Sequence, residues 1–406
     1  MRDPGKAPTA AVAGAGAPLW LLALVTFTGT LAMHVFVPAL PVAARDLGVG
    51  APSMQLTISL YILGLAVGQL IYGPVSDRFG RRPTLMAGLA IYIVASLGAA
   101  AADDVRVLIG MRLLQALGGC AGLVLARAIV RDLAAPTEAV RRLALLNLMV
   151  TVGPGLAPLL GGALAGSAGW RSIFVGLTAL GVTGLVLTWR LLPETTAPSA
   201  AAGAGLLRSY GRLLRSPAFL GFAIGGGCAT TSMYAFIAAA PFVFTQDLHQ
   251  PIERVGVYVA ILVLGVWVGS ILATRLVGRV PPRRLMIGAN ALSAIAALVL
   301  LASVVSGHLS VGLTIASMFV FTLGGGTASP AALTEAVSVD PRIIGSASGL
   351  YGFIQMAVGG LCTALVGLGT DPALSAAVVL AGAGIVAQLS FWGAARYQRT
   401  RSGLGG

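Results

Sequence analysis

The sequence predicts an all-α protein that crosses a membrane many times. Of its 406 residues, 57% are hydrophobic and only 10% are charged, whereas soluble domains carry about a quarter charged residues. The hydrophobic residues fall into about a dozen runs of roughly twenty, the length that a helix needs to cross ~30 Å of hydrocarbon. A transmembrane β-barrel would instead alternate with period two. Composition and run length therefore exclude both a soluble protein and a barrel.

Twelve spans follow one another along the chain, each an apolar run bounded by polar, Gly or Pro residues. Before them, residues 1–17 lack the apolar core of a signal peptide, and we interpret them as a cytoplasmic tail. A polar linker, 193–216, separates a first six-helix bundle, 18–192, from a second, 217–395, and a second tail covers 396–406. In chain order, the predicted spans are 18–38, 53–73, 83–102, 105–126, 138–165, 171–192, 217–244, 253–274, 285–306, 309–333, 344–369 and 372–395.

The basic residues are divided unequally between the two sides of these spans. The side that holds both tails and the linker carries 21 of the 26, and Arg112 lies within a span. Since basic residues accumulate on the cytoplasmic side, both termini are predicted to be cytoplasmic. The net charge of +13 is spread over short loops rather than one face, which argues against nucleic acid as a partner. The opposite side carries only Arg45, Arg106, Arg171 and Arg254.

The two halves of the chain are weakly similar in sequence pattern. Residues 73–83 join spans two and three, and a similar basic segment, 278–284, joins spans eight and nine. A repeat of six and six spans around a cytoplasmic linker is the plan of a secondary transporter, with a binding site between two pseudo-symmetric bundles. Cys120, Cys228 and Cys362 each stand alone in a span, so we expect small packing residues rather than a disulfide or a metal site.

Several motifs resemble those of a known family. Residues 73–82 resemble the loop signature of the major facilitator superfamily, and Arg112-Leu113-Leu114-Gln115 is similar to the fourth-span motif of its drug/proton antiporters. Segments 37–41, 55–61, 169–174 and 241–243 resemble the Bcr/CflA-type drug exporters, the group of phenicol and bicyclomycin efflux proteins. The fifth-span antiporter motif of the family is matched by Gly153, Pro154, Pro158, Gly161 and Gly162.

This resemblance implies a role for each motif. The loop is expected to act as a conformational switch, in which the Asp77 carboxylate holds a helix N-terminus or an arginine in one conformer. Two glycines would allow a tight turn beside it. In the fifth span, the Gly153-Pro154 pair is expected to kink the helix and help close the cavity. The residues assigned to the switch are Gly73, Asp77, Arg78, Gly80, Arg81 and Arg82.

Arg112 is the residue whose placement within a membrane span costs the most free energy, because its side chain is charged. It lies about seven residues into the fourth span, roughly 10 Å deep, where a guanidinium needs water or a partner. With Gln115, Ala116 and Gly119 it falls on one helical face, at spacings of three, four and seven residues. We interpret this polar, small face as a cavity wall; a snorkelling arginine is the alternative.

The chain departs from the family at the proton carrier. All thirteen acidic residues lie in predicted loops or at span ends, and His34 stands where relatives carry an aspartate in the first span. A group that loads and unloads a proton inside the cavity is needed for proton-coupled export. We therefore expect His34, beside Arg112, to be that group, with a purely structural histidine, or coupling through Asp77 or Asp132, as the alternatives.

Isolated polar, aromatic and thioether side chains in apolar helices are further candidates for a pocket that takes varied amphipathic molecules. Each could equally pack between helices. They are Met33, Phe36, Tyr61, Gln69, Asn147, Tyr234, Phe236, Trp267, Tyr351 and Gln355.

These observations favour export of small amphipathic drugs by alternating access, with protons moving inward, no cofactor beyond the proton gradient and no metal. We expect a monomer whose partners are the drug, protons and the lipid bilayer. A carrier of one metabolite, or a facilitated transporter without proton coupling, is the alternative. An enzyme would need a nucleophile with a base, or a metal cluster, and a channel a ring of pore charges; the sequence holds no such pattern.

Overall fold

The computed structural model describes residues 17–134, 136–195, 206–276, 279–340 and 343–403, and every regular element in these ranges is helical. The first half of the chain supplies eight of them. They are α1 (Leu19–Val35), the short helix η1 (Val37–Ala39), α2 (Leu40–Asp46), α3 (Ala51–Phe79), α4 (Arg81–Ala100), α5 (Val105–Leu133), α6 (Pro136–Ser167) and α7 (Arg171–Leu191).

The second half repeats this pattern after a short helix that precedes the seventh span. Its elements are α8 (Leu206–Leu214), α9 (Pro217–Thr230), α10 (Met233–Phe242), η2 (Val243–Asp247), α11 (Ile252–Leu276), α12 (Pro282–Val305), α13 (Val311–Val337), α14 (Ile344–Gly367) and α15 (Pro372–Gly403).

Eleven of the twelve predicted membrane spans are confirmed. In the described part of the chain, 11 segments are long and apolar enough to cross a membrane. The remaining prediction, 138–165, falls within α6, which is helical from Pro136 to Ser167 and whose segment Gly155–Ser167 is apolar. The protein is therefore an all-α polytopic membrane protein.

The structure differs from the predicted spans mainly at their ends. The first span continues beyond residue 38 to Asp46, with a break at η1, where Pro38 begins a new helical turn. The seventh span is divided between α9 and α10 at Thr231 and Ser232. Helix α8 lies inside the predicted linker, and α15 runs on to Gly403. Polar side chains at a helix end reach water and leave the backbone helical, so hydropathy does not mark where the helix stops.

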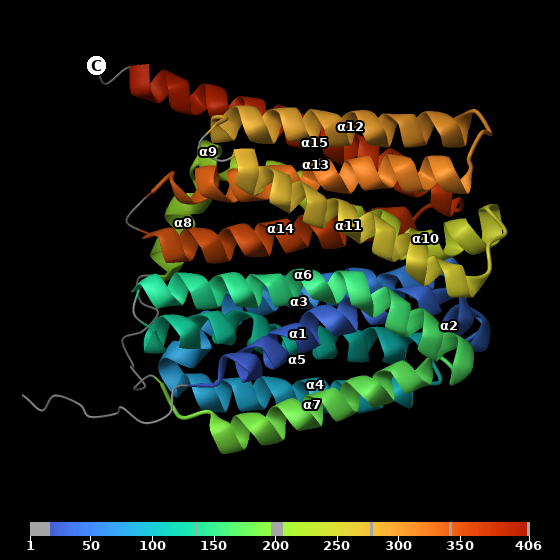
Figure 1. Cartoon of the computed structure of the whole chain (residues 1–406), viewed down its shortest axis with the longest axis horizontal. Helices are drawn as coiled ribbons and strands as arrows, with labels where there is room; N and C mark the ends of the chain where they lie inside the picture. The colour runs from blue at the N-terminus through green and yellow to red at the C-terminus, as the bar shows by residue number, and fades with distance from the viewer. Residues whose placement is uncertain (1–16, 135, 196–205, 277–278, 341–342, 404–406) are drawn as a thin grey trace, which may run out of the picture.

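Two groups of helices lie side by side (Figure 1). In the first half, α5 packs against α1, α3 and α4, while α1 also packs against α6 and α4 against α7. In the second half, α13 packs against α9, α11 and α12, while α15 packs against α9 and α12. The start of α1, the end of α15 and helix α8 all lie on the left of the view. We call this end the termini side and the opposite end the far side.

The two groups meet along two seams, α3 with α14 and α6 with α11. Both seams contain glycines set against the backbone of the other half. A Cβ on Gly256 of α11 would lie 2.5 Å from the carbonyl oxygen of Pro158, and one on Gly360 of α14 would lie 3.3 Å from that of Ser59. The absence of a side chain thus lets the two bundles approach closely.

Candidate functional site

A cavity of about 450 Å³ lies between the two bundles. From the first half it is lined by residues of α1, α3, α5 and α6, and from the second half by residues of α10, α13 and α14. A smaller cavity of about 230 Å³ adjoins it and shares Tyr234, Ser329, Gln355 and Met356. Pockets at the interface of two packed units are the usual place for a small ligand. We call the larger one the central cavity.

His34 lies in the wall of the central cavity and is buried. Its Nδ1 atom is 2.9 Å from the backbone oxygen of Thr30, one turn earlier on α1. A carbonyl oxygen only accepts hydrogen bonds, so Nδ1 carries the hydrogen of the neutral ring. The other nitrogen, Nε2, is buried and has no hydrogen-bond partner among the described residues. The ring therefore presents an unoccupied proton acceptor in the cavity wall.

Arg112 is fully buried but does not line the central cavity. Its guanidinium lies over the Tyr61 ring, with Cζ 4.1 Å from the ring centroid, and Phe36 and Phe174 are the next closest rings. It donates to the backbone oxygen of Ala32 at 3.0 Å and to Oε1 of Gln115 at 2.6 Å. An aromatic cage and two neutral acceptors thus replace part of the water that a buried cation needs, while Nε and Nη2 have no hydrogen-bond partner among the described residues.

The face of α5 that carries Arg112 packs against neighbouring helices in this structure, which differs from the cavity wall that its polarity suggested. Gln115 donates to Ser96 of α4 at 2.8 Å. Gly119 lies against Gly29 of α1, where a Cβ on Gly119 would be 3.0 Å from the Cα of Gly29. Small residues at helix contacts produce the same spacing as a cavity wall, so the spacing alone could not separate them.

The other pocket candidates divide into two groups. Met33, Gln69, Tyr234, Tyr351 and Gln355 line the central cavity. Four more do not line it: Phe36, Tyr61 and Phe236 are buried within the bundles, and Trp267 contacts Gly155. The side chain of Asn147 lies outside the described residues.

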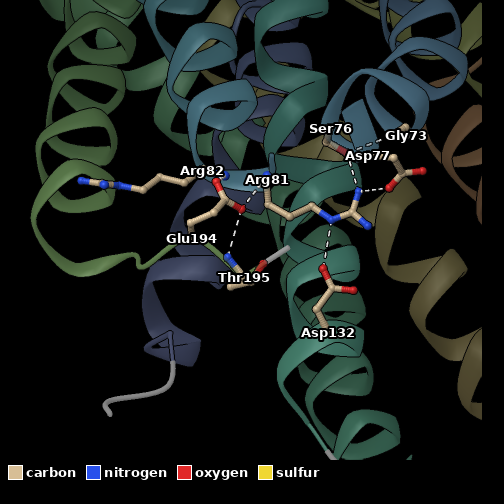
Figure 2. A network of polar contacts seen from close by, with 8 residues as sticks. All are labelled: Gly73, Ser76, Asp77, Arg81, Arg82, Asp132, Glu194 and Thr195. Atoms are coloured by element: carbon tan, nitrogen blue, oxygen red, sulfur yellow. Dashed lines mark hydrogen bonds and ion pairs between the residues drawn. The ribbon is translucent and has the colours of Figure 1, made fainter. Parts of the chain in front are cut away.

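The predicted switch loop forms a charged network on the termini side (Figure 2). Arg81 bridges two carboxylates: its NH1 is 2.5 Å from Oδ1 of Asp77, and its Nε is 3.0 Å from Oδ2 of Asp132 at the end of α5. Gly80 has φ +97°, a left-handed conformation that glycine adopts without strain, so the turn lies where we expected it. Gly73 instead lies inside α3, and its expected role in the turn is wrong.

The other two arginines of the loop serve different contacts. Arg78 lies over the ring of Phe79, with Cζ 5.3 Å from the centroid. Arg82 donates from NH2 to the backbone oxygen of Trp189 in α7, at 2.5 Å. The loop therefore joins α3, α4, α5 and α7 at one end of the first bundle.

Glu194 completes this network from 112 residues further along the chain than Arg82. Its carboxylate accepts hydrogen bonds from the backbone nitrogens of Arg81 at 2.9 Å and Arg82 at 3.2 Å (Figure 2). These are the first residues of α4, whose free N–H groups and dipole favour a negative charge. A Cβ on Gly80 would lie 2.6 Å from Oε2 of Glu194. This close contact is a second reason, besides the positive φ, why a glycine is needed at this position.

The antiporter motif lies in α6, which is continuous from Pro136 to Ser167. Gly153, Pro158, Gly161 and Gly162 are all buried, whereas the side chain of Pro154 lies outside the described residues. A Cβ on Gly161 would fall well inside van der Waals distance of the Val35 carbonyl, just before the break in the first span. The nearest atom to a Cβ on Gly162 would be 3.9 Å away, on Pro38. The glycines of the motif thus let α6 pack tightly against the end of α1, just before the break in the first span.

Sequence reasoning missed three functional candidates because it assigned them to loops. Arg127 and Arg131 line the central cavity, and Glu194 caps α4. Asp132, which pairs with Arg81, was considered only as an alternative site of proton coupling. The two arginines were counted only toward the charge asymmetry between the sides. Their spacing of four residues, which places both on one face of α5, was the signal that could have found them.

Comparison with known proteins fits this architecture. The model of the Major Facilitator Superfamily matches residues 22–364. The "Uncharacterized MFS-type transporter YdgK" of Bacillus subtilis (strain 168) is 30% identical over 92% of this chain and 94% of its own. "Multidrug resistance protein D" of Escherichia coli (strain K12) is 31% identical, over 86% of this chain and 87% of its own.

A "Chloramphenicol resistance protein" of Pseudomonas aeruginosa is 33% identical, over 66% of this chain and 62% of its own. Among solved structures, a bacterial homologue of the human lysosomal transporter Spinster, in an inward-facing and unoccupied conformation, superposes with a TM-score of 0.75 at 17% identity. It covers 94% of this chain and 97% of its own, and it shows the shared fold. The chain belongs to the Major Facilitator Superfamily, in its Bcr/CflA-type drug-efflux group, and is a membrane transporter rather than an enzyme.

Proposed function

We propose that this transporter exports small amphipathic drug-like molecules across the bacterial inner membrane by alternating access, in exchange for protons. The central cavity carries the proposal, because both bundles line it and a relative movement of the bundles would change the side from which it is reached. The resistance proteins among its relatives support a drug as cargo. Each chain holds its own cavity, so a monomer suffices.

The position of the cavity supports an access path from the termini side. Its wall runs from His34 and Tyr234, near the middle of the bundles, to Arg131, two residues before α5 ends on the termini side. Beyond His34, α10 packs against η1 and α2 and closes the far side. The excess of basic residues on the termini side makes that side cytoplasmic under the positive-inside rule. This conformer then corresponds to an inward-facing state.

His34 is the proton acceptor that this mechanism needs. Its Nε2 atom is buried and has no hydrogen-bond partner among the described residues, and the bond from Nδ1 to Thr30 fixes the tautomer. The described lining contains no Asp or Glu that could take this role. A proton arriving from outside would add a positive charge to the wall, and its release to the cytoplasm would reset the cavity for the next molecule.

Two measurements test the proposal. A host without its own pumps that expresses the chain should survive phenicols at several times the normal concentration, and a protonophore should abolish this protection. In proteoliposomes, phenicol transport should be accompanied by a flux of protons in the opposite direction, and His34→Gln and His34→Ala should remove this proton flux. A full proton flux in both variants would exclude His34 as the carrier. Protection that survives the protonophore would instead support a facilitated transporter.

A further inference from the structure

The central cavity contains two positive charges. Arg127 and Arg131 both line it, and they lie four residues apart on α5, which places them on one face of the helix. Arg127 is buried deeper, while Arg131 is exposed at the end of the cavity on the termini side. The described lining residues include no carboxylate. The wall therefore carries a net positive charge wherever the structure describes it.

The ion pairs described on the termini side join carboxylates to basic residues that do not line the cavity. Asp77 and Asp132 bind Arg81, while Glu194 accepts from the backbone at the start of α4. The same part of the structure also pairs Glu138 with Arg142, Glu335 with Arg283, and Asp340 with Arg212. These carboxylates would have to leave their partners to receive a cationic ligand. Since the sequence places no acidic residue in the middle of a span, none can approach from deeper in the membrane.

The rest of the wall is apolar or neutral. Met33, Leu65, Leu123, Tyr234 and Met356 provide aliphatic, thioether and aromatic surface. A charged end and an apolar body match an amphipathic ligand, and arginine makes strong two-point hydrogen bonds to planar anions such as carboxylates. Placing two like charges against each other across a protein interface costs several kcal/mol. A lipophilic cation placed against Arg127 and Arg131 would therefore be disfavoured.

We infer that the transported molecules are amphipathic organic anions, and that Arg127 and Arg131 select them by binding the anionic head group while the apolar body lies toward Met33 and Tyr234. This inference rests on the proposed export function and narrows its substrate class. Uncharged amphiphiles with strong hydrogen-bond acceptors enter more weakly, and lipophilic cations are excluded.

An anionic cargo also suits a carrier without a carboxylate inside the membrane. The negative potential of the cytoplasm pushes an anion outward, by about fiftyfold in concentration for each 100 mV. A cation exporter works against the same potential and depends on proton exchange for every molecule. Export of anions therefore places a weaker demand on the single histidine of the cavity.

Two dyes with the same xanthene ring system but opposite charge test the inference: fluorescein, an anion, and rhodamine 123, a cation. Binding to purified full-length protein is measured by fluorescence anisotropy, and uptake into proteoliposomes by counterflow, with the uncharged chloramphenicol as a third ligand. Fluorescein should bind at least tenfold more tightly than rhodamine 123, and fluorescein and chloramphenicol should exchange across the membrane while rhodamine 123 does not.

Variants then assign the selectivity. Arg127→Gln with Arg131→Gln should reduce the preference for fluorescein at least fivefold, while the double lysine variant, which keeps both charges, should retain most of it. Arg208→Gln with Arg215→Gln, which removes two charges from exposed positions in α8 and just after it, is the matched control and should change nothing. The lysine variant also shows that any loss comes from the charge and not from misfolding.

The outcomes separate the two proposals. If chloramphenicol exchanges and rhodamine 123 binds as tightly as fluorescein, the anion selectivity is refuted and the export function stands. If the preference for fluorescein persists in the double glutamine variant, the assignment to Arg127 and Arg131 is refuted. If none of the three compounds binds or exchanges while the protein is folded, the proposed function fails together with the inference.

Discussion

Glu194 reaches back across 113 residues to Arg81: its Oε1 atom accepts a 2.9 Å hydrogen bond from the backbone nitrogen of that residue. The contact ties the end of α7 to the first turn of α4. The Arg81 side chain in turn holds Asp77 of α3 and Asp132 of α5. One carboxylate thus fixes the helix start from which the bridging arginine projects, so the geometry of the switch depends on a residue outside the motif.

Replacing Gly80 with alanine should lower stability and transport, whereas the same replacement at Gly73 should change neither. Gly80→Ala forces a side chain into φ +97° and toward Oε2 of Glu194, so we expect a loss of about 1–3 kcal/mol in stability and little transport. Gly73→Ala lies inside α3, where a Cβ meets nothing within 4 Å, and should keep both. Thermal unfolding in detergent and phenicol export would measure the pair. Equal losses would show that the left-handed turn is not what the motif requires.

Glu194→Ala should loosen the start of α4. It removes the acceptor for two backbone N–H groups, a change that costs about 1 kcal/mol at helix N-termini. We expect a lower unfolding temperature and a faster rate of conformational exchange, read from cysteine labelling on the termini side. Asp103→Ala is the control, because it removes an exposed ion pair with Arg171 that is worth at most about 1 kcal/mol. A larger effect at Asp103 than at Glu194 would contradict the capping role.

Arg112→Lys should abolish most transport although it keeps the charge. A lysine ammonium can donate to Ala32 and Gln115 as Nη1 of the arginine does, but it has no planar face to lie over the Tyr61 ring, and a buried cation–π contact contributes up to about 2 kcal/mol. We expect at least a tenfold loss of phenicol export in vesicles at normal expression. Arg106→Lys, at an exposed position on the far side, should behave as the parent. Parent-level export by Arg112→Lys would show that charge alone suffices.

Alanine substitutions at two neighbouring glycines of α6 should differ sharply in their effect on stability and export. Gly161→Ala brings a methyl group against the Val35 carbonyl, and overpacking of this kind costs about 1–3 kcal/mol. Gly162→Ala finds its nearest neighbour at 3.9 Å and should be tolerated. Export assays and thermal unfolding of the two variants test this, and a tolerated Gly161→Ala would refute the tight fit of α6 against α1.

Membrane potential should act differently on cargoes of different charge. In proteoliposomes with a potential set by potassium and valinomycin, export of fluorescein should rise with the potential that drives anions outward, by more than export of uncharged chloramphenicol. Liposomes with Arg127→Gln and Arg131→Gln protein serve as the control. The same potential dependence for both cargoes would contradict transport of an anion.

The twelve spans could be predicted because hydrocarbon imposes a minimum length on an apolar helix. Their ends could not, since turns such as 127–133 of α5 remain helical after their side chains become polar. Breaks were also hidden: Thr231 and Ser232 interrupt the seventh span without any strong helix breaker. Tertiary contacts, rather than local preference, decide these positions.

The cavity could be predicted only in part. Met33, His34 and Gln355 were recognised because each is an unusual side chain in an apolar helix. Tyr61 and Phe36 have the same property but pack around Arg112. Helices that are apolar on every side carry no hydrophobic stripe to reveal which face looks inward, so composition cannot separate a cavity wall from a helix contact.

The close glycine contacts between the bundles have a consequence for energy conservation in the cell. At Gly256 and Gly360 backbone atoms of the other half lie close to the glycine, so little side-chain volume separates the two halves there. A leucine at Gly256 would have to push α6 and α11 apart, because even a Cβ there would lie 2.5 Å from the carbonyl oxygen of Pro158. We therefore expect liposomes that contain the Gly256→Leu protein to leak protons faster than those with the parent, which would dissipate the gradient on which the cell depends.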